Sequence, residues 1–173
     1  MTYRYAIGLG SNRSHGRYGR PRAVIAAALK LLRPIAVSHI IETAPIGPSS
    51  RRFANAAALV ESGLAPPDLL ALLKRIERDF GRRGARRWGA RVLDLDILLW
   101  SGGYWSSAML AIPHIRLIER RFALDPLAEI APGWRIPGHG TVRQHAARLT
   151  RRMPVHRSGR RRVRSSVGRA SDF

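Results

Sequence analysis

Hydrophobic and polar residues alternate along several short segments of the chain, while in other segments the hydrophobic residues recur every three or four positions. Alternation predicts half-buried strands, and the wider spacing predicts amphipathic helices. Two helices are expected, one that starts at Pro21 and ends before Pro34 and one that starts at Pro66 and ends before Gly81. Four strands are expected at Tyr3 to Leu9, Ile35 to Glu42, Phe53 to Glu61 and Arg91 to Trp100.

The order of these elements is strand, helix, strand, strand, helix, strand. This order predicts an α+β fold, a ferredoxin-like split βαβ sandwich with a βαββαβ core and helices on one face of an antiparallel sheet. A short C-terminal elaboration would follow the core. We expect residues 1–150 to form this domain.

The last 23 residues differ in composition from the rest. Residues 151–173 contain eight Arg, one acidic residue and no apolar periodicity, which predicts a basic, disordered tail. The functional alternative is a basic arm that contacts nucleic acid, and the other alternative is a solvated extension.

The formal net charge of the chain is +20, and 29 of its 31 basic residues are Arg. Arg binds phosphate through a planar fork, so the bias is compatible with phosphate recognition, although a GC-rich genome would produce the same bias. The chain has no Cys, which excludes a disulfide framework and a thiol nucleophile. Its longest uncharged apolar stretch, Ala23 to Leu29, is too short to span a membrane. Because no secretory signal is visible, we expect a cytoplasmic protein.

The last expected strand carries two carboxylates in an apolar sequence. Asp94 and Asp96 are two positions apart, so they would project from the same face, roughly 7 Å apart along the strand. Leu93, Leu95, Ile97 and Leu99 would share the opposite face. Two such carboxylates would repel each other unless a cation joined them, and Mg²⁺ is the cation that combines carboxylates with substrate phosphates. Alternatively, both carboxylates face solvent.

Five arginines lie within eleven positions just before this strand, in the segment Gly81 to Arg91. A segment of this kind can close guanidinium groups over phosphates near a metal ion, where they stabilise the charge on a transferring phosphoryl group. The alternative is a solvated basic loop. A P-loop lysine motif and a dinucleotide-binding glycine motif are both absent from the sequence.

Several segments, read together, resemble the 6-hydroxymethyl-7,8-dihydropterin pyrophosphokinase family across about residues 3 to 135. They are GLGSN (Gly8 to Asn12), TAPIGP (Thr43 to Pro48), FANAA (Phe53 to Ala57), IE (Ile76-Glu77), RWGAR (Arg87 to Arg91), LDLDIL (Leu93 to Leu98), IPH (Ile112 to His114) and the RRFAL region (Arg120 to Pro132). The resemblance implies a monomeric enzyme that moves a diphosphate from ATP to a pterin alcohol, and it implies the same sandwich fold. A nucleic-acid or membrane partner is not expected.

The resemblance also implies a role for individual residues. Asp94 and Asp96 would hold two Mg²⁺ ions with ATP, and Arg82 and Arg91 would be the catalytic arginines that close on the phosphates. The pterin would be bound by Thr43, Phe53, Asn55 and Phe122, with the two Phe rings on either side of it. ATP would be bound by Glu77, Arg83, Trp88, Ile97, His114 and Arg120, with Glu77 supporting the site from its helix.

Some positions depart from the family pattern. Met109 and Ala111 stand where the family often has a basic and a hydroxyl group, and Ile115 follows the His. These changes predict weaker ATP binding and leave open a degraded relative that binds pterin or nucleotide without turnover. A third reading is a ferredoxin-like RNA-binding module with a basic arm, against which the paired carboxylates count.

Overall fold

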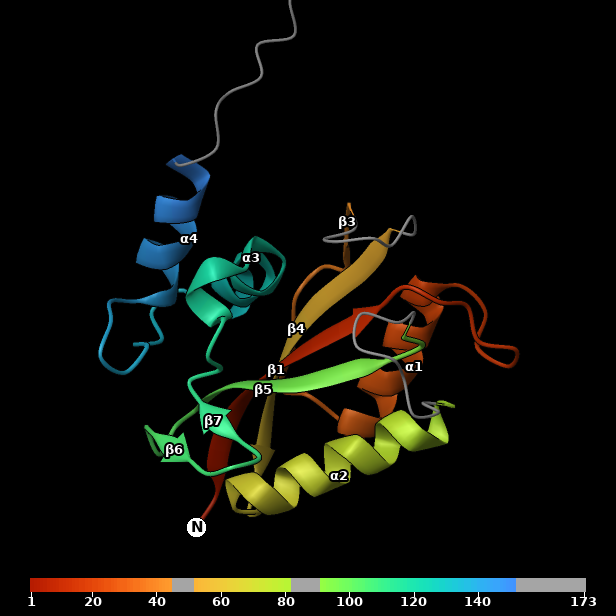
Figure 1. Ribbon diagram of the computed structural model, residues 1–173, viewed down its shortest axis with the longest axis horizontal. Helices are drawn as coiled ribbons and strands as arrows, with labels where there is room; N and C mark the ends of the chain where they lie inside the picture. The colour runs from red at the N-terminus through yellow and green to blue at the C-terminus, as the bar shows by residue number, and fades with distance from the viewer. Residues whose placement is uncertain (45–51, 82–90, 152–173) are drawn as a thin grey trace, which may run out of the picture.

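The computed structural model describes residues 1–44, 52–81 and 91–151, which form a β-sheet with helices on both faces (Figure 1). The first half of the chain forms β1 (Tyr3–Ser11), α1 (Pro21–Leu32), β2 (Ala36–Val37), β3 (Ile41–Thr43) and β4 (Phe53–Ser62). The second half forms α2 (Pro66–Asp79), β5 (Asp94–Trp100), β6 (Trp105–Ser106), β7 (Ala111–Ile112), the 3-10 helix η1 (Leu117–Glu119), α3 (Arg121–Ile130) and α4 (Val142–Arg151).

The main sheet is antiparallel throughout, with the strand order β2-β4-β1-β5 and with β3 also paired to β4. The central pair, β1 and β4, is hydrogen-bonded from Tyr3 opposite Ser62 to Ser11 opposite Ala54. β5 pairs with β1 and forms one edge of the sheet. The α+β architecture with an antiparallel sheet is confirmed.

The expected strand Ile35 to Glu42 is interrupted, because β2 and β3 are separate segments. Between them, the Ser38 hydroxyl accepts a hydrogen bond from the Ala57 amide at 2.9 Å and donates one to the His39 carbonyl. A side chain therefore takes over a bond that the strand ladder would otherwise make. The interruption lets two short segments follow one side of β4.

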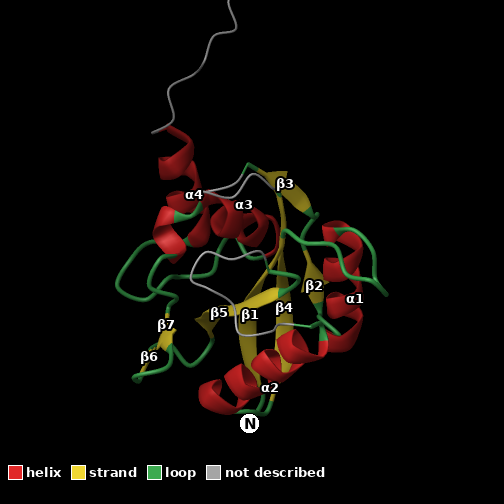
Figure 2. Cartoon of the chain, turned by 45° about the vertical axis from the view of Figure 1, so that its right-hand side comes forward, coloured by secondary structure: helices red, strands yellow, loops and turns green. Residues whose placement is uncertain are grey.

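Both expected helices form where their proline signals place them, with Pro21 and Pro66 in the first turns of α1 and α2. Figure 2 shows these two helices on the same side of the sheet. Their buried side chains, among them Val24 and Leu73, pack with Ile7 and Leu95 in one hydrophobic cluster. This half of the sandwich agrees with the expectation.

The opposite face is also covered, so the expectation of helices on one face is incomplete. A second hydrophobic cluster joins Ala6, Ala57 and Leu98 of the sheet to Leu124 and Leu127 of α3, and α4 packs beside α3. The residues that β1 and β4 contribute to this cluster, Ala6 and Ala57, are small, which lets α3 pack close to the sheet. The C-terminal elaboration is thus a second layer on the sheet (Figure 1).

The expected alternation along β5 fails near its end. Ile7 pairs with Ile97, but the preceding residue, Ala6, pairs with Leu99, so one extra residue is inserted at Leu98. A bulge of this kind shifts the following side chains to the other face. Leu99 consequently packs in the cluster of α3 rather than with Leu95, contrary to the sequence-based expectation.

The segment that was expected to form a disordered tail begins at the last residue of α4, Arg151, and its residues 152–173 lie outside the described residues. The predicted domain boundary therefore stays a prediction. Across residues 1–44, 52–81 and 91–151, we find no helix with the length and apolar character that crossing a membrane demands.

Candidate functional site

A cavity of about 380 Å³ lies on the face of the sheet that carries α3. Its size falls within the range of small-molecule sites. Strands β1, β4 and β5 provide the floor, the end of β3 provides one wall, and the segment from His114 through η1 into α3 provides another. Acidic, basic and aromatic side chains all line it: Asp94, Asp96, Glu119, Arg91, Arg116, Arg120, His114, Phe53 and Phe122.

The strand register explains the shape of the floor. Gly10 lies between Asn55 of β4 and Asp94 of β5, and Gly8 is paired with Asp96. A Cβ atom at Gly10 would lie 3.5 Å from Asn55 Oδ1 and 3.9 Å from Asp94 Cβ. The central strand therefore contributes no side chain between the polar residues on either side. This arrangement leaves the carboxylates open to the cavity.

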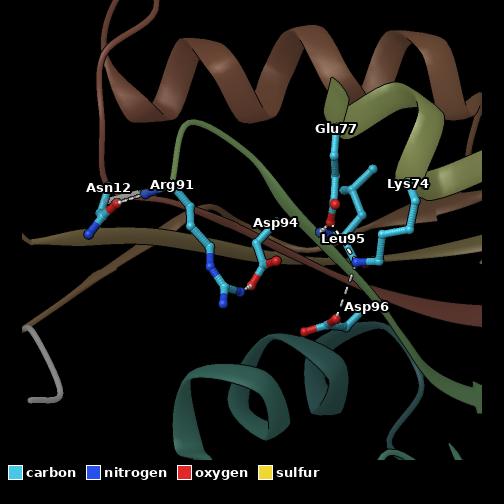
Figure 3. A network of polar contacts seen from close by, with 7 residues as sticks. All are labelled: Asn12, Lys74, Glu77, Arg91, Asp94, Leu95 and Asp96. Atoms are coloured by element: carbon cyan, nitrogen blue, oxygen red, sulfur yellow. Dashed lines mark hydrogen bonds and ion pairs between the residues drawn. The ribbon is translucent and has the colours of Figure 1, made fainter. Parts of the chain in front are cut away.

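Asp94 lies at the start of β5, next to a basic side chain. Arg91 Nη1 donates a hydrogen bond to Asp94 Oδ2 at 2.5 Å. The backbone of Arg91 is itself fixed, because its amide donates to Asn12 Oδ1 at 2.7 Å and its carbonyl accepts from the Asn12 amide at 3.1 Å. The turn after β1 thus holds the residue whose guanidinium reaches the first carboxylate (Figure 3).

The backbone between the two carboxylates is held from α2. Glu77 is fully buried, and its Oε1 accepts the Leu95 amide at 2.7 Å and the Lys74 ammonium at 2.7 Å. Lys74 Nζ also donates to the Leu95 carbonyl at 2.9 Å and lies 3.9 Å from Asp96 Oδ1. Figure 3 shows these contacts converging on β5 from the helix.

The wall opposite the carboxylates combines an amide with aromatic rings. Asn55 Nδ2 donates to Thr43 Oγ1 at 2.9 Å, which joins the ends of β4 and β3. Phe53 and Phe122 both line the cavity, and the Arg120 guanidinium lies 5.5 Å from the centre of the Phe122 ring. A flat, polar-edged ligand could stack on such rings while the amide group binds its edge.

His114 lines the cavity close to the carboxylates. Burial lowers the pKa of His114, Asp96 opposes that shift, and Arg120 adds to it. The Arg116 amide donates to His114 Nδ1 at 3.1 Å. Because Nδ1 accepts this hydrogen bond, the neutral ring carries its proton on Nε2. His114 can therefore donate a hydrogen bond without carrying a charge.

The donor set of the site suits a hard divalent cation. Asp94 and Asp96 offer carboxylate oxygens, and Mg²⁺ in proteins typically uses one or two carboxylates and completes its shell with waters and substrate phosphates. Within residues 1–44, 52–81 and 91–151, no group of three or more His, Cys, Asp or Glu side chains could hold a metal ion. Two carboxylates supply only part of a metal ion's ligands, so this arrangement fits an ion that is also bound by a phosphate group of the ligand.

The structure brings nine of the fourteen predicted site residues together around the cavity. These are Thr43, Phe53, Asn55, Arg91, Asp94, Asp96, His114, Arg120 and Phe122. Glu77 contacts the backbone of β5 and Ile97 is buried in the cluster beneath α1 and α2, so neither lines the cavity. Arg82, Arg83 and Trp88 lie outside the described residues.

Sequence reasoning did not single out four residues that the structure places at the site. Arg116 and Glu119 line the cavity and lie 3.6 Å apart between Nε and Oε2. Asn12 and Lys74 lie behind the cavity and hold the segments that carry the carboxylates. Asn12 is the last residue of the GLGSN segment, and its available signal was a polar residue directly after a buried strand. Lys74 gave no signal beyond its place on α2.

Met109 and Ile115, noted as departures from the family pattern, are 85% and 81% exposed, and they do not line the cavity. Their effect on ATP binding stays a prediction.

The α+β fold and the cavity, with its paired carboxylates and arginines, are those of a protein suited to bind a phosphate ester together with a metal ion. Comparison with known proteins narrows this class. The family model described as 7,8-dihydro-6-hydroxymethylpterin-pyrophosphokinase (HPPK) matches residues 6–132. The chain belongs to this family.

Relatives and solved structures agree with the family match. A protein named 2-amino-4-hydroxy-6-hydroxymethyldihydropteridine pyrophosphokinase from Pseudomonas aeruginosa is 40% identical over 144 residues, which cover 79% of this chain and 86% of the relative. A protein of the same name from Methylorubrum extorquens is 40% identical over 156 residues, which cover 86% of this chain and 94% of the relative. The crystal structure of Plasmodium falciparum HPPK-DHPS matches with a TM-score of 0.65 at 14% identity, over 88% of this chain and 45% of that one. That last likeness supports the fold alone.

Proposed function

We propose that the protein transfers a diphosphate from ATP to 6-hydroxymethyl-7,8-dihydropterin and releases AMP, as a step of tetrahydrofolate biosynthesis. The family match and the names of the relatives support this activity. The observation that carries it in the structure is the projection of Asp94 and Asp96 into one cavity that also contains arginines and two Phe rings. A degraded relative and an RNA-binding module are not favoured.

Asp94 and Asp96 are the residues that would hold Mg²⁺, and we propose two ions bound with ATP. When bound, the ions supply charge neutralisation on the phosphate oxygens. Before that, Arg91 offsets the charge of Asp94, and Lys74 lies near Asp96. The positive charges of Arg91 and Lys74 thus reduce the repulsion between the two neighbouring carboxylates in this partly buried cavity.

The arginines would stabilise the transferring group. Arg91 lines the cavity and is held on its backbone by Asn12, so its guanidinium is positioned before substrates bind. We propose that Arg82 joins Arg91 as the second catalytic arginine, and that Arg83, Trp88 and Arg120 contact ATP. Preorganised charge of this kind contributes more than mobile charge, because little reorganisation is needed when the barrier is crossed.

ATP binding would extend along the wall that contains His114. The neutral Nε2–H of His114 can donate to a phosphate oxygen, and Arg120 adds a positive charge nearby. We propose that Glu77 acts on ATP indirectly, because it supports the β5 backbone at Leu95. Ile97 would contribute from the core side of the same strand.

The pterin would lie between Phe53 and Phe122, with Asn55 and Thr43 at its polar edge. Both rings line the cavity, and the Asn55 amide is already oriented by its bond to Thr43. Stacking orients a flat ring, while the amide selects for its hydrogen-bonding edge. A pterin held this way would direct its hydroxymethyl group toward the carboxylates.

In the proposed reaction, the hydroxymethyl oxygen forms a bond to the β-phosphorus of ATP, and the bond from that phosphorus to the α-phosphate bridging oxygen breaks. AMP leaves with that oxygen, and the hydroxyl proton passes to solvent. No covalent enzyme intermediate is needed, because holding two reactants in line replaces a costly bimolecular encounter. The protein contributes position and charge rather than a nucleophile.

We further propose that the fold is the ferredoxin-like sandwich, for which the strand order β2-β4-β1-β5 and the position of α1 and α2 are the supporting observations. We also propose that the protein is a monomer and that its location is cytoplasmic. A folded domain of residues 1–150 and a basic tail of residues 151–173 complete the proposal.

The test is AMP release from ATP, measured with and without the pterin alcohol and with and without Mg²⁺. We expect AMP only when all three are present. Asp96→Asn should lower kcat by at least about a hundredfold, a loss of roughly 2.7 kcal/mol of transition-state stabilisation. Asp68→Asn, at an exposed position in the first turn of α2, is the matched control and should leave AMP release unchanged.

Retained turnover in Asp96→Asn would contradict the proposed metal site. Tight pterin and nucleotide binding without AMP release in the wild-type protein would favour the degraded relative instead.

A further inference from the structure

The edge strand β5 has backbone groups on its outer side that no neighbouring strand in the described part of the chain pairs, and side chains of α2 bind two of them. An edge strand leaves N–H and C=O groups without a ladder partner. At Leu95, midway between the two carboxylates, the amide donates to Glu77 and the carbonyl accepts from Lys74. Both groups on the outer edge are therefore paired with one ion pair of the helix.

Lys74 takes part in every contact of this arrangement except the Leu95 amide bond. Its ammonium lies 2.7 Å from Glu77 Oε1, 2.9 Å from the Leu95 carbonyl oxygen and 3.9 Å from Asp96 Oδ1. Its side chain is 32% exposed, while that of Glu77 is fully buried. One ammonium group thus links a buried carboxylate, the strand backbone and a carboxylate of the cavity (Figure 3).

We propose that Lys74 is a positioning residue for the carboxylate pair, a role that rests on the proposed function. Through the Leu95 carbonyl it fixes the strand segment from which Asp94 and Asp96, on either side of Leu95, both project into the cavity. A bond at the residue between them controls the position of both. Charge-assisted hydrogen bonds are short and directional, so they suit this task better than neutral ones.

The proposal separates the hydrogen bonds of Lys74 from its charge. If position is what matters, a neutral donor at residue 74 should preserve much of the effect. If only the charge near Asp96 matters, removing it should strengthen Mg²⁺ binding, because an ammonium group repels a divalent cation. The two explanations predict opposite responses to the same substitutions.

The chain offers a matched control, because its only two lysines are Lys30 and Lys74. Lys30 is exposed at the end of α1, away from the residues that line the cavity. We would compare Lys74→Met, Lys74→Gln, Lys74→Arg and Lys30→Met. AMP release is measured per folded molecule, at saturating Mg²⁺ and well below each variant's melting temperature, so that a loss of stability does not appear as a loss of activity.

We expect Lys74→Met to lower kcat by roughly tenfold to a hundredfold with little change in the KM for ATP, because misplacement of reacting groups acts on the chemical step. Lys74→Gln and Lys74→Arg should lie closer to wild type, and Lys30→Met should equal it. A Lys74→Met variant with wild-type kcat, or a Lys74→Gln variant that loses as much kcat as Lys74→Met, would overturn the proposal.

A second measurement does not depend on turnover. The NMR signals of the Leu95 amide and of the Asp94 and Asp96 carboxyl carbons should shift in Lys74→Met and stay in place in Lys30→Met. Unshifted signals would overturn the positioning role. A wild-type protein that forms no AMP while these signals shift in Lys74→Met would instead count against the proposed function.

Discussion

Asn12, which follows β1, and Arg91, which precedes β5, are joined by two hydrogen bonds. The Asn12 side chain accepts the Arg91 amide at 2.7 Å, and the Asn12 amide donates to the Arg91 carbonyl at 3.1 Å. Asn12 is only 3% exposed, so these bonds are shielded from water. They fix the residue that follows segment 82–90 and set the guanidinium that contacts Asp94.

Replacing Asn12 with Ala should therefore affect both stability and catalysis. The Arg91 amide loses its partner at a partly buried position, which costs about 1–3 kcal/mol in the free energy of unfolding. We also expect kcat to fall more than tenfold, because Arg91 is no longer held against Asp94. Asn12→Asp keeps an acceptor oxygen and should recover part of both losses. Urea denaturation and AMP release measure the two effects, and an Asn12→Ala enzyme with wild-type kcat would refute the assigned role of Asn12.

The two aromatic residues of the cavity should act on pterin rather than on ATP. Phe122→Ala removes one ring of the proposed stack, and we expect the KM for the pterin to rise about tenfold, equivalent to about 1.4 kcal/mol of binding. The KM for ATP should change less than twofold. Phe122→Leu retains apolar bulk without the ring and tests whether stacking itself matters. Steady-state kinetics with each substrate varied in turn would show the split; an equal rise in both KM values would contradict the pterin assignment.

We expect alanine substitutions at two glycines of β1 to differ in their effect on the free energy of unfolding. A Cβ atom at Gly8 would lie 3.2 Å from a Leu98 methyl group, inside the cluster beneath α3, whereas a Cβ at Gly10 meets nothing closer than 3.5 Å. Gly8→Ala should therefore cost about 1 kcal/mol or more by overpacking. Gly10→Ala should be nearly neutral for stability. Thermal or urea unfolding of the two variants provides the comparison, and equal stability of both would show that Leu98 yields without cost.

His145 on α4 should make stability depend on pH. Burial, followed by Arg148 and His139, lowers the pKa of His145 from its ordinary 6.5. Between the lowered folded-state pKa and 6.5 the unfolded chain binds more protons, so the free energy of unfolding rises with pH in that window. The contribution is fully present above about pH 6.5 and is lost as the pH falls toward the folded-state pKa.

His145→Gln should remove this part of the pH dependence, and because His114 stays in both proteins, the difference between them isolates His145. Urea denaturation at pH 5 and pH 7.5 would show a smaller difference for the variant. The same pH dependence in both proteins would contradict the account.

The sequence predicted the long strands of the main sheet and the helices on one of its faces because those signals were local, whereas the layer formed by α3 and α4 was expected only as a short elaboration. Prolines at 21 and 66 marked the starts of α1 and α2, and alternation marked β1 and β5. The break between β2 and β3 depends on a Ser38 bond to Ala57, a partner 19 positions away, and no local pattern reports it. The bulge at Leu98 likewise depends on the pairing of β5 with β1.

The candidate site was predicted where short motifs carry chemistry, as with Asp94 and Asp96. Two of the residues that sequence reasoning missed act through long-range contacts. Lys74 reaches a backbone carbonyl 21 positions later, and Asn12 reaches an amide 79 positions later. Such contacts follow from the packing of α2 and the turn after β1 against β5, which composition and spacing do not encode.

The central claim, that two carboxylates serve transfer of a diphosphate rather than a single phosphate, is tested most directly by ³¹P NMR of the reaction mixture. With ATP, Mg²⁺ and 6-hydroxymethyl-7,8-dihydropterin, we predict the signal of AMP together with two coupled signals from a diphosphate ester of the pterin. ADP with a single uncoupled phosphate ester, or unchanged ATP at enzyme concentrations comparable to those of the substrates, would contradict it.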